Sequence, residues 1–376
     1  MIGVKKGKKV PKSKCTLDEI YDAIESEGSK AGAARKLGID LRNMQRRLSK
    51  EGERNPGYSA HGYSTLRKFE DGDGTVILEW EKTSKDKQQQ VDDLDELVKG
   101  LVADLKPIKA VKAPKYAPTE LLNLLTISDY HLGSMSWHEE TGADWDIKIA
   151  EELLTKWFGC AIDLAPKADV TVISLLGDFM HFSGIVPVTE KSHNILDADT
   201  RLGKLTQVAA RVIRRVIDMT LKRYKHVHFV YTTGNHDESV SYLYRTMMNE
   251  IYRDEPRLTV EMSPSLYYAY EFGDTSLFFH HGHKRRGKNL DEVFVAKFSE
   301  IFGRTKHRYA HTGHLHSVKV EETSLLLLTQ HPTLAAPDAY AAQGGWISKR
   351  SSSVTTYHKE HGKFIEYTIT PEMVLK

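Results

Sequence analysis

The chain has 376 residues, 40% of them hydrophobic, which is enough for one large domain with a sizeable core and a smaller one. Its formal net charge of +2 is too close to neutral to indicate a class of partner. Two cysteines, Cys15 and Cys160, exclude a disulfide framework and favour a reducing compartment. No apolar stretch of about 18 residues occurs, and none follows the lysine-rich N-terminus, so we expect a cytoplasmic protein that neither spans a membrane nor is secreted.

Residues 1–60 are predicted to be a basic tail followed by a DNA-binding module of three short helices. Apolar residues recur at helical spacing through residues 16–50, and Gly38 interrupts them. This spacing resembles a helix-turn-helix in which residues 40–50 form the recognition helix. Long cationic side chains and an asparagine suit phosphates and base edges in a major groove. The predicted DNA contacts on this helix are Arg42, Asn43, Arg46, Arg47 and Lys50. A tri-helical packing or oligomerisation module with solvated arginines is the alternative.

Residues 61–118 are predicted to form a β-hairpin, a helix and a linker. Apolar and polar side chains alternate over residues 63–83, on both sides of a tight-turn sequence at 71–74. Residues 84–106 place leucines at helical spacing, and the Lys, Pro and Ala of residues 106–118 indicate a linker. A domain boundary near residue 119 follows.

Residues 119–376 are predicted to form a layered α/β domain, because apolar strands alternate with helical patterns. The clearest amphipathic helix covers residues 201–225. The strand candidates are 124–128, 170–176, 227–233, 276–280 and 324–329.

Five polar motifs follow apolar runs in this second part of the chain. They are Asp129 to His131, Gly177 to His181, Gly234 to Asp237, His281 to His283, and Gly313 to His316. Carboxylate, amide and imidazole ligands at strand ends suit two adjacent divalent cations. Their order and composition resemble the calcineurin-like metallophosphoesterase superfamily over roughly residues 121–340. The resemblance implies a four-layer sandwich, in which two mixed sheets are flanked by helices.

The resemblance also implies a set of metal ligands. Asp129, His131 and His316 would hold one ion, Asn235, His281 and His314 the other, and Asp178 would bridge the two. Glycine in these turns is expected to let the backbone bend and aim the side chains inward. Mixed oxygen and nitrogen ligation suits Mn²⁺, our first choice, with Fe, Zn²⁺ or Mg²⁺ as alternatives. The family places a ligand just before Gly282, which selects His281, whereas a strand one residue longer would turn His280 inward.

Three further residues are predicted to be catalytic. By resemblance, His236 contacts the phosphate and helps to protonate the leaving group, and Asp237 is expected to hold its imidazole in the useful tautomer. His181 gives an Asp-x-x-His form similar to the DNA-repair exonucleases of the superfamily, in which this histidine assists at the phosphate. An ordinary polar loop residue is the alternative for His181.

The leading hypothesis is a DNA nuclease or DNA-end-processing enzyme that its N-terminal module delivers to DNA. Lys284, Arg285 and Arg286 are predicted to follow the phosphates of the bound strand, or else form a solvated basic loop. The layout is similar to proteins of tailed bacteriophages and prophages, which would place the chain in the host cytoplasm. The alternatives are a phosphatase or cyclic-nucleotide phosphodiesterase, and a DNA-binding regulator with a scaffold phosphoesterase domain. A homo-oligomer is possible.

Overall fold

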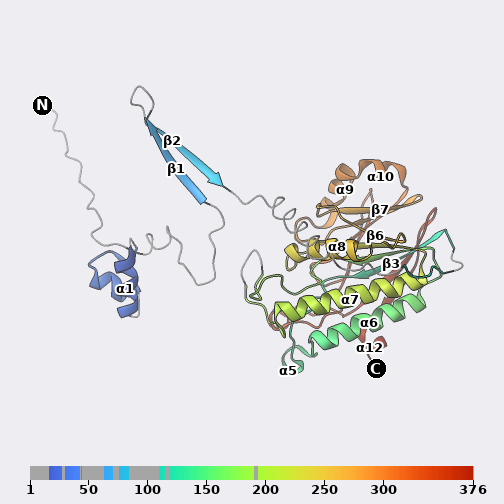
Figure 1. Cartoon of the computed structure of the whole chain (residues 1–376), viewed down its shortest axis with the longest axis horizontal. Helices are drawn as coiled ribbons and strands as arrows, with labels where there is room; N and C mark the ends of the chain where they lie inside the picture. Colours follow the sequence, from blue (N-terminus) through green and yellow to red (C-terminus); the bar gives the residue numbers. More distant parts are fainter. Residues whose placement is uncertain are drawn as a thin grey trace. The chain divides into compact units, whose positions relative to one another are not determined.

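The computed structural model describes residues 17–27, 30–42, 44, 63–70, 76–83, 110–114, 118–189 and 194–375. The chain divides into two compact units, Met1–Asp86 and Lys87–Lys376 (Figure 1). The predicted helix at 84–106 lies outside the described residues, as do the predicted DNA contacts Asn43, Arg46, Arg47 and Lys50. Among the described residues of both units, no helix is long and apolar enough to cross a membrane.

The first unit contains two packed helices and an antiparallel strand pair. Helices α1 (Leu17–Glu27) and α2 (Lys30–Lys36) enclose a small apolar core. Its buried members are Ile20, Ala23, Ala33, Ala34 and Met44. Strands β1 (Tyr63–Glu70) and β2 (Val76–Thr83) pair as the hairpin prediction requires, although the predicted turn at 71–74 lies outside the described residues.

A six-stranded mixed sheet forms the centre of the second unit, in the order β13-β12-β3-β4-β5-β6. Its four parallel strands are β3 (Leu121–Ile127), β4 (Val170–Leu175), β5 (His226–Tyr231) and β6 (Leu258–Val260). Strand β12 (Ser352–His358) runs antiparallel to β3, and β13 (Gly362–Ile369) runs antiparallel to β12. The parallel strands β3, β4 and β5 are buried along almost their whole length, which explains their continuous apolar sequences.

A five-stranded mixed sheet lies against the first, in the order β10-β11-β9-β8-β7. Its three parallel strands are β8 (Thr275–Phe279), β9 (His307–Thr312) and β11 (Leu327–Gln330). The antiparallel edge strands are β7 (Tyr268–Phe272) and β10 (Lys319–Glu322). Side chains from both sheets share one core, in which Leu122 and Leu124 of β3 pack with Leu277 and Phe279 of β8.

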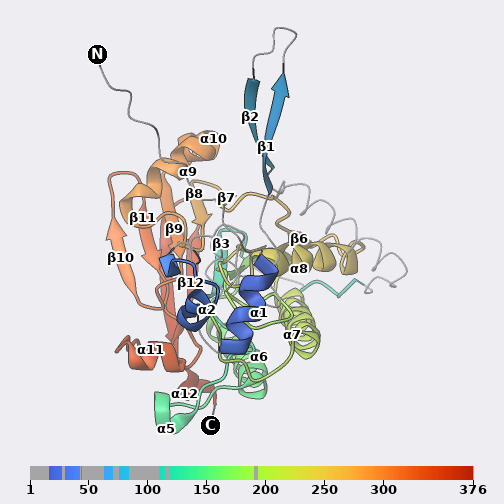
Figure 2. The ribbon, with the colours of Figure 1, turned by 90° about the vertical axis from the view of Figure 1, so that its left-hand side faces the viewer.

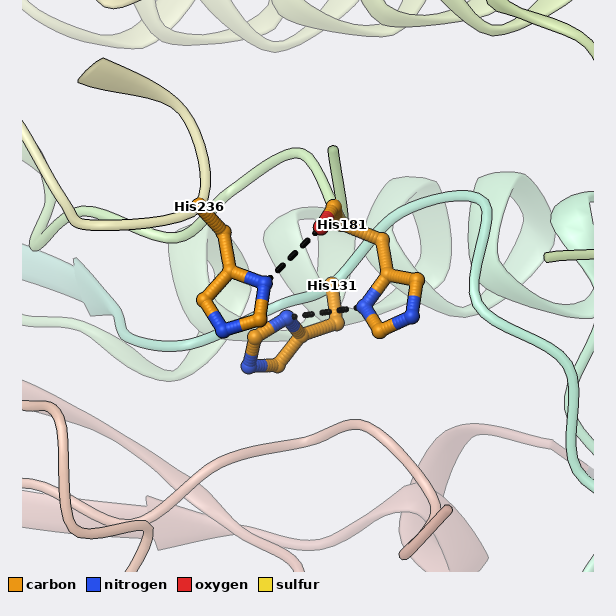
Figure 3. A group of neighbouring side chains, drawn as sticks. All are labelled: His131, His181 and His236. Atoms are coloured by element: carbon orange, nitrogen blue, oxygen red, sulfur yellow. Dashed lines mark hydrogen bonds between the residues drawn. The ribbon is translucent and has the colours of Figure 1, made fainter. Parts of the chain in front are cut away.

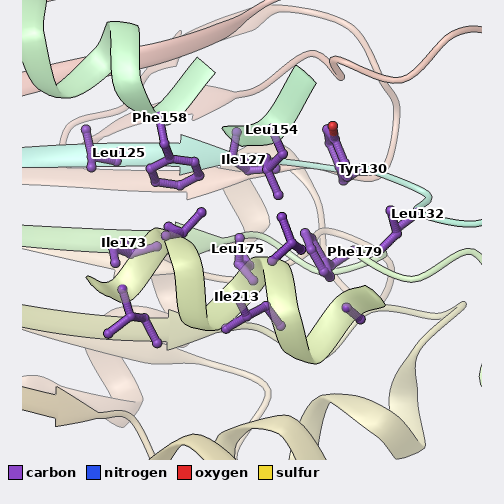
Figure 4. Packing of buried hydrophobic residues seen from close by; sticks show 14 of the residues in the cluster. Leu125, Ile127, Tyr130, Leu132, Leu154, Phe158, Ile173, Leu175, Phe179 and Ile213 are labelled. Carbon is purple, nitrogen blue, oxygen red and sulfur yellow. The ribbon is translucent and has the colours of Figure 1, made fainter. Parts of the chain in front are cut away.

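Helices cover the outer faces of both sheets. The other face of β3 directs Leu125 and Ile127 into a core with the long helices (Figure 4). These helices are α6 (Ile147–Leu164), α7 (Leu202–Arg223) and α8 (Glu238–Ile251). Helices α9 (Asp291–Lys297) and α10 (Ser299–Arg304) pack on Phe278 at the outer face of the five-stranded sheet (Figure 2). The second unit is therefore an α/β fold of two mixed sheets flanked by helices, as predicted.

Short helices complete the second unit. They are α5 (His138–Thr141), the 3-10 helix η1 (Gly287–Asn289), α11 (Ala339–Gln343) and α12 (Pro371–Val374).

Part of the predicted linker 106–118 packs on this unit. The amide of Val111 donates to Glu255 (2.8 Å), and the side chain of Val111 contacts the large core.

One predicted strand begins later than expected, and the strands β6, β7, β9, β10, β12 and β13 of the second unit were not predicted. The candidate at 324–329 begins in the turn that joins β10 to β11, so the strand starts only at Leu327. Strand β9 was not predicted, because His307, Arg308 and His311 interrupt its apolar pattern. This strand is central to the five-stranded sheet and leads directly into the last polar motif.

Candidate metal centre

The seven predicted metal ligands come together in space. They follow β3, β4 and β5 of one sheet and β8 and β9 of the other, and the carboxyl ends of parallel strands share one edge. Donor atoms within 4.8 Å of one another form the groups Asp129, His131, His316 and Asp178, His281, His314, and a third group of His131, His181 and His236 shares His131 with the first. Asn235 joins the second group, since its Oδ1 lies 3.2 Å from His281 Nε2.

His281 connects the two groups. Its Nε2 lies 3.0 Å from Asp178 Oδ2 and 4.0 Å from Asp129 Oδ1, while its Nδ1 is 2.6 Å from the carbonyl oxygen of Leu176. His280 turns away, because β8 ends at Phe279; its Nδ1 is 2.9 Å from the carbonyl oxygen of Leu266. The geometry therefore directs His281, not His280, into the site.

The backbone at the ligands adopts an unusual conformation. Among the described residues, positive φ angles outside glycine occur at Asp129, His131, Asp178, His314 and His316, with values from 46° to 74°. All five are predicted ligands. A non-glycine residue in the left-handed region is uncommon and costs of order 1–3 kcal/mol. Such strain concentrates where the surrounding fold must hold a side chain in one direction.

Glycines beside the ligands have two different roles. Gly177 has a φ of 84° and supplies the expected tight bend. Gly234 and Gly313 have no positive φ, and the reason for glycine there is close approach. A Cβ at Gly234 would overlap the carboxylate of Asp178, and a Cβ at Gly313 would overlap the hydroxyl of Ser128 and the carboxylate of Asp129. These glycines make room for the oxygen ligands.

The two carboxylates are held by other polar groups. The amide of His314 donates to both oxygens of Asp129, at 3.0 and 2.9 Å, and the hydroxyl of Ser128 donates to one of them. Thr333 donates its hydroxyl to the carbonyl oxygen of Asp129 (2.6 Å). The amide of His236 donates to Asp178 Oδ1 (2.8 Å). Ser128 and Thr333 were not predicted to support the site.

The electrostatics of the site favour a cation. Burial alone would raise the pKa of Asp129 and Asp178, but nearby imidazoles hold both values below the usual range. Burial alone would lower the pKa of His281, but these carboxylates raise it to about 10. Burial lowers the pKa of His314 to about 4, so this ligand is neutral. Two buried carboxylates among imidazole nitrogens are a donor set that fits borderline divalent metals. A bound cation would supply the positive charge that a protonated His281 otherwise provides beside these carboxylates.

The structure corrects the role of Asp237. We expected its carboxylate to orient the imidazole of His236, but the Nδ1 of His236 is 2.9 Å from the carbonyl oxygen of His181 (Figure 3). Asp237 is fully buried and accepts from the hydroxyl of Tyr231 (2.6 Å). It also accepts from the amides of Asp178, Phe179, Met180 and Gly234. Asp237 therefore shapes the turn that carries Asp178 and does not contact the proposed proton donor.

His181 lies next to His131. Its Nδ1 is 3.2 Å from the Nδ1 of His131, and its ring stacks on that of His236 with centroids 5.7 Å apart (Figure 3). Its side chain is buried, with 2% of the residue exposed. The predicted catalytic residues His181 and His236 therefore both adjoin the group that contains Asp129.

Basic and aromatic side chains are exposed on the loops that leave this end of the sheets. Lys284, Arg285 and Arg286 follow the fourth motif and are all exposed. Trp137 and Trp346, on the loops after β3 and α11, are 62% and 58% exposed, and Tyr340 in α11 is 73% exposed. In the first unit, Arg42 is also exposed, at the edge of the described residues.

No family model and no curated protein match the sequence. Among solved structures, the chain is similar to a conserved protein from Streptococcus pneumoniae TIGR4 described as a predicted phosphoesterase, with 10% identity over 67% of this chain and 100% of that one, and a TM-score of 0.28. It is similar to an archaeal phosphodiesterase with 13% identity over 66% of this chain and 99% of that one, and a TM-score of 0.33. It is similar to Vps29 from Entamoeba histolytica in complex with Zn²⁺, with 12% identity over 66% and 99% of the two chains, and a TM-score of 0.28.

Proposed function

We propose that the chain is a phosphodiester hydrolase of the metallophosphoesterase type that uses two divalent metal ions. The observation that carries this proposal is the pair of ligand groups around Asp129 and Asp178, which His281 joins at 4.0 and 3.0 Å. Two adjacent cations held by these residues would activate water and neutralise charge on a phosphate. Mn²⁺ remains our first choice.

His236 is the proposed proton donor to the leaving group. Its Nδ1 is held by the carbonyl oxygen of His181, so the opposite nitrogen, Nε2, is the one that can exchange a proton at the site. The amide of the same residue donates to the proposed bridging ligand Asp178, which fixes the imidazole next to the metal ligands. A proton donor placed in this way assists departure of an alkoxide.

DNA is the proposed substrate. Lys284, Arg285 and Arg286 are exposed directly after the ligand loop of His281, where they can contact phosphates on either side of the bond that is cut. Exposed aromatic rings on neighbouring loops, such as Trp137 and Trp346, suit the stacking of unpaired bases. The proposed helix-turn-helix in the first unit would add a second contact with DNA.

A substrate panel tests the activity. Purified protein, loaded with Mn²⁺, is incubated with single-stranded DNA, double-stranded DNA, RNA, bis-p-nitrophenyl phosphate and p-nitrophenyl phosphate. We expect cleavage of DNA and of bis-p-nitrophenyl phosphate, and little release of p-nitrophenol from p-nitrophenyl phosphate. The Asp178→Asn variant, purified in parallel, controls for contaminating nucleases. Hydrolysis of the monoester alone would replace the nuclease proposal with a phosphatase, and bound metal without any hydrolysis would support a scaffold role.

A salt series tests the two DNA contacts separately. The full-length variants R42Q/R46Q/R47Q and K284Q/R285Q/R286Q should each bind DNA more weakly and with a flatter salt dependence, because fewer counterions are released. Both should hydrolyse bis-p-nitrophenyl phosphate at the native rate, since that small diester needs no extended contact surface. An unchanged salt slope in the first variant would contradict the helix-turn-helix assignment and leave the enzyme assignment intact.

A further inference from the structure

His181 contacts two different histidines of the site through two different groups (Figure 3). Its ring nitrogen Nδ1 lies 3.2 Å from the Nδ1 of His131, and its carbonyl oxygen lies 2.9 Å from the Nδ1 of His236. The backbone around it is also fixed, because its amide donates to the carbonyl oxygen of Leu132 (3.0 Å). One residue thus touches both a predicted metal ligand and the proposed proton donor.

The contact with His131 determines which nitrogen of that ligand carries a proton. The Nε2 of His131 lies 3.2 Å from the Nε2 of His316, so this is the nitrogen that faces the other ligands. A neutral imidazole that binds a cation through Nε2 must carry its proton on Nδ1. The partner of that N–H is the Nδ1 of His181, which therefore has to act as an acceptor.

The other nitrogen of His181 does not reach the open side of the site. His181 Nε2 is closed to solvent. With Nδ1 engaged by His131 and Nε2 enclosed, neither nitrogen is available to a phosphate that enters from solvent.

We propose that His181 is a positioning residue for the metal centre and not a catalytic residue. Its Nδ1 accepts from the Nδ1–H of His131, which leaves the Nε2 lone pair of His131 free for a metal ion. This inference rests on the proposed metal-dependent function, but it concerns a different quantity, which is the affinity of the site for metal.

Two substitutions separate the positioning role from a role at the phosphate. An asparagine places its amide oxygen close to the position of Nδ1, so His181→Asn keeps an acceptor for His131. His181→Ala removes it and leaves the main-chain carbonyl that contacts His236. The affinity for Mn²⁺ is measured by competition with a coloured chelator, without substrate. We expect His181→Ala to bind metal about 10- to 100-fold more weakly. The affinity of His181→Asn for Mn²⁺ should stay within about threefold of the native value, because the amide oxygen still accepts the hydrogen bond from His131.

The outcomes are distinct. Native metal affinity in His181→Ala, together with slow turnover, would overturn the proposal and place His181 at the phosphate. Equal loss of affinity in both variants would also overturn it, because the acceptor would then not be the cause. A native protein that binds no metal would instead overturn the proposed function.

A measurement on the unmodified protein covers the case in which His181→Ala does not fold. In the Zn²⁺-loaded protein, ¹⁵N NMR of the histidine rings should show His131 with its proton on Nδ1. Absence of that proton would overturn the proposal without any variant.

Discussion

The two sheets contribute different chemistry to the metal centre. The six-stranded sheet supplies all the predicted oxygen ligands, Asp129, Asp178 and Asn235, whereas the predicted ligands of the five-stranded sheet are all imidazoles. The group of Asp129 includes His316, and the group of Asp178 includes His281 and His314, so each carboxylate is grouped with imidazoles from the other sheet. The site is therefore a property of the docked sheets, and neither sheet alone would bind two metal ions.

The division also separates charge. The oxygen half carries two fully buried carboxylates, and the imidazole half carries the groups that balance them. Burial opposes a charge on His316, but Asp129 raises its pKa, as both carboxylates do for His281. Divalent cations would take over this balance, so changes in the two halves should have different consequences.

Of the changes considered, Asp178→Asn in the six-stranded half should have the largest effect on the metal centre. The predicted bridging residue would lose the charge that offsets two cations, so we expect loss of both metal ions and of all measurable turnover. Metal content by mass spectrometry and hydrolysis of bis-p-nitrophenyl phosphate check this. Two retained metal ions with native turnover would reject Asp178 as the bridge.

His236→Ala removes a residue of the oxygen half that is not a predicted ligand. It should retain both metal ions but hydrolyse the diester about 10²–10⁴-fold more slowly, the range for loss of a positioned proton donor. His226, which is exposed at the start of β5, gives a matched control, and His226→Ala should behave as the native protein. Loss of metal in His236→Ala would make it a ligand instead.

A matched pair of substitutions probes the imidazole half. His281→Ala should lower the occupancy of one metal ion and reduce turnover, because it removes the side chain that contacts both carboxylates. His280→Ala should keep full occupancy, since its imidazole is directed to Leu266. Metal titration of both variants is the measurement, and the reverse pattern would mean that the ligand register is shifted by one residue.

The pH dependence of metal binding should show the smallest of these effects. His281 has its pKa raised to about 10, so below that pH it is protonated and must lose the proton before it can bind a cation. Affinity should therefore rise with pH, by about tenfold per unit between pH 7 and 9. Calorimetry in two buffers of different ionisation enthalpy should detect the released proton. An affinity that does not change over this range would contradict the assignment.

The sequence predicted which side chains gather at the candidate metal centre, because each of them follows an apolar strand and belongs to a short motif. Helix α7 also matched its amphipathic pattern closely. The supports of the ligands were harder to predict, since Thr333 reaches Asp129 across 204 residues of chain without any local signal. Adjacency in sequence was misleading at Asp237, whose side chain points away from His236 into the core. The positive φ angles were not predicted either: Asp and His are enriched in that region, but such residues remain uncommon and no local signal marks the ones that adopt it.

The hydrogen bonds that Asp129 accepts from a backbone amide limit when the metal centre can form during synthesis. They come from His314, 185 residues further along the chain, so Asp129 cannot reach its final position until His314 has been synthesised. Contacts of such long sequence separation form late in folding. A ribosome-bound chain that ends before β8 contains every oxygen ligand but none of the imidazoles of the second sheet. If the site binds metal ions as proposed, we expect their uptake to follow the synthesis of His314, so that the newly made chain is metal-free.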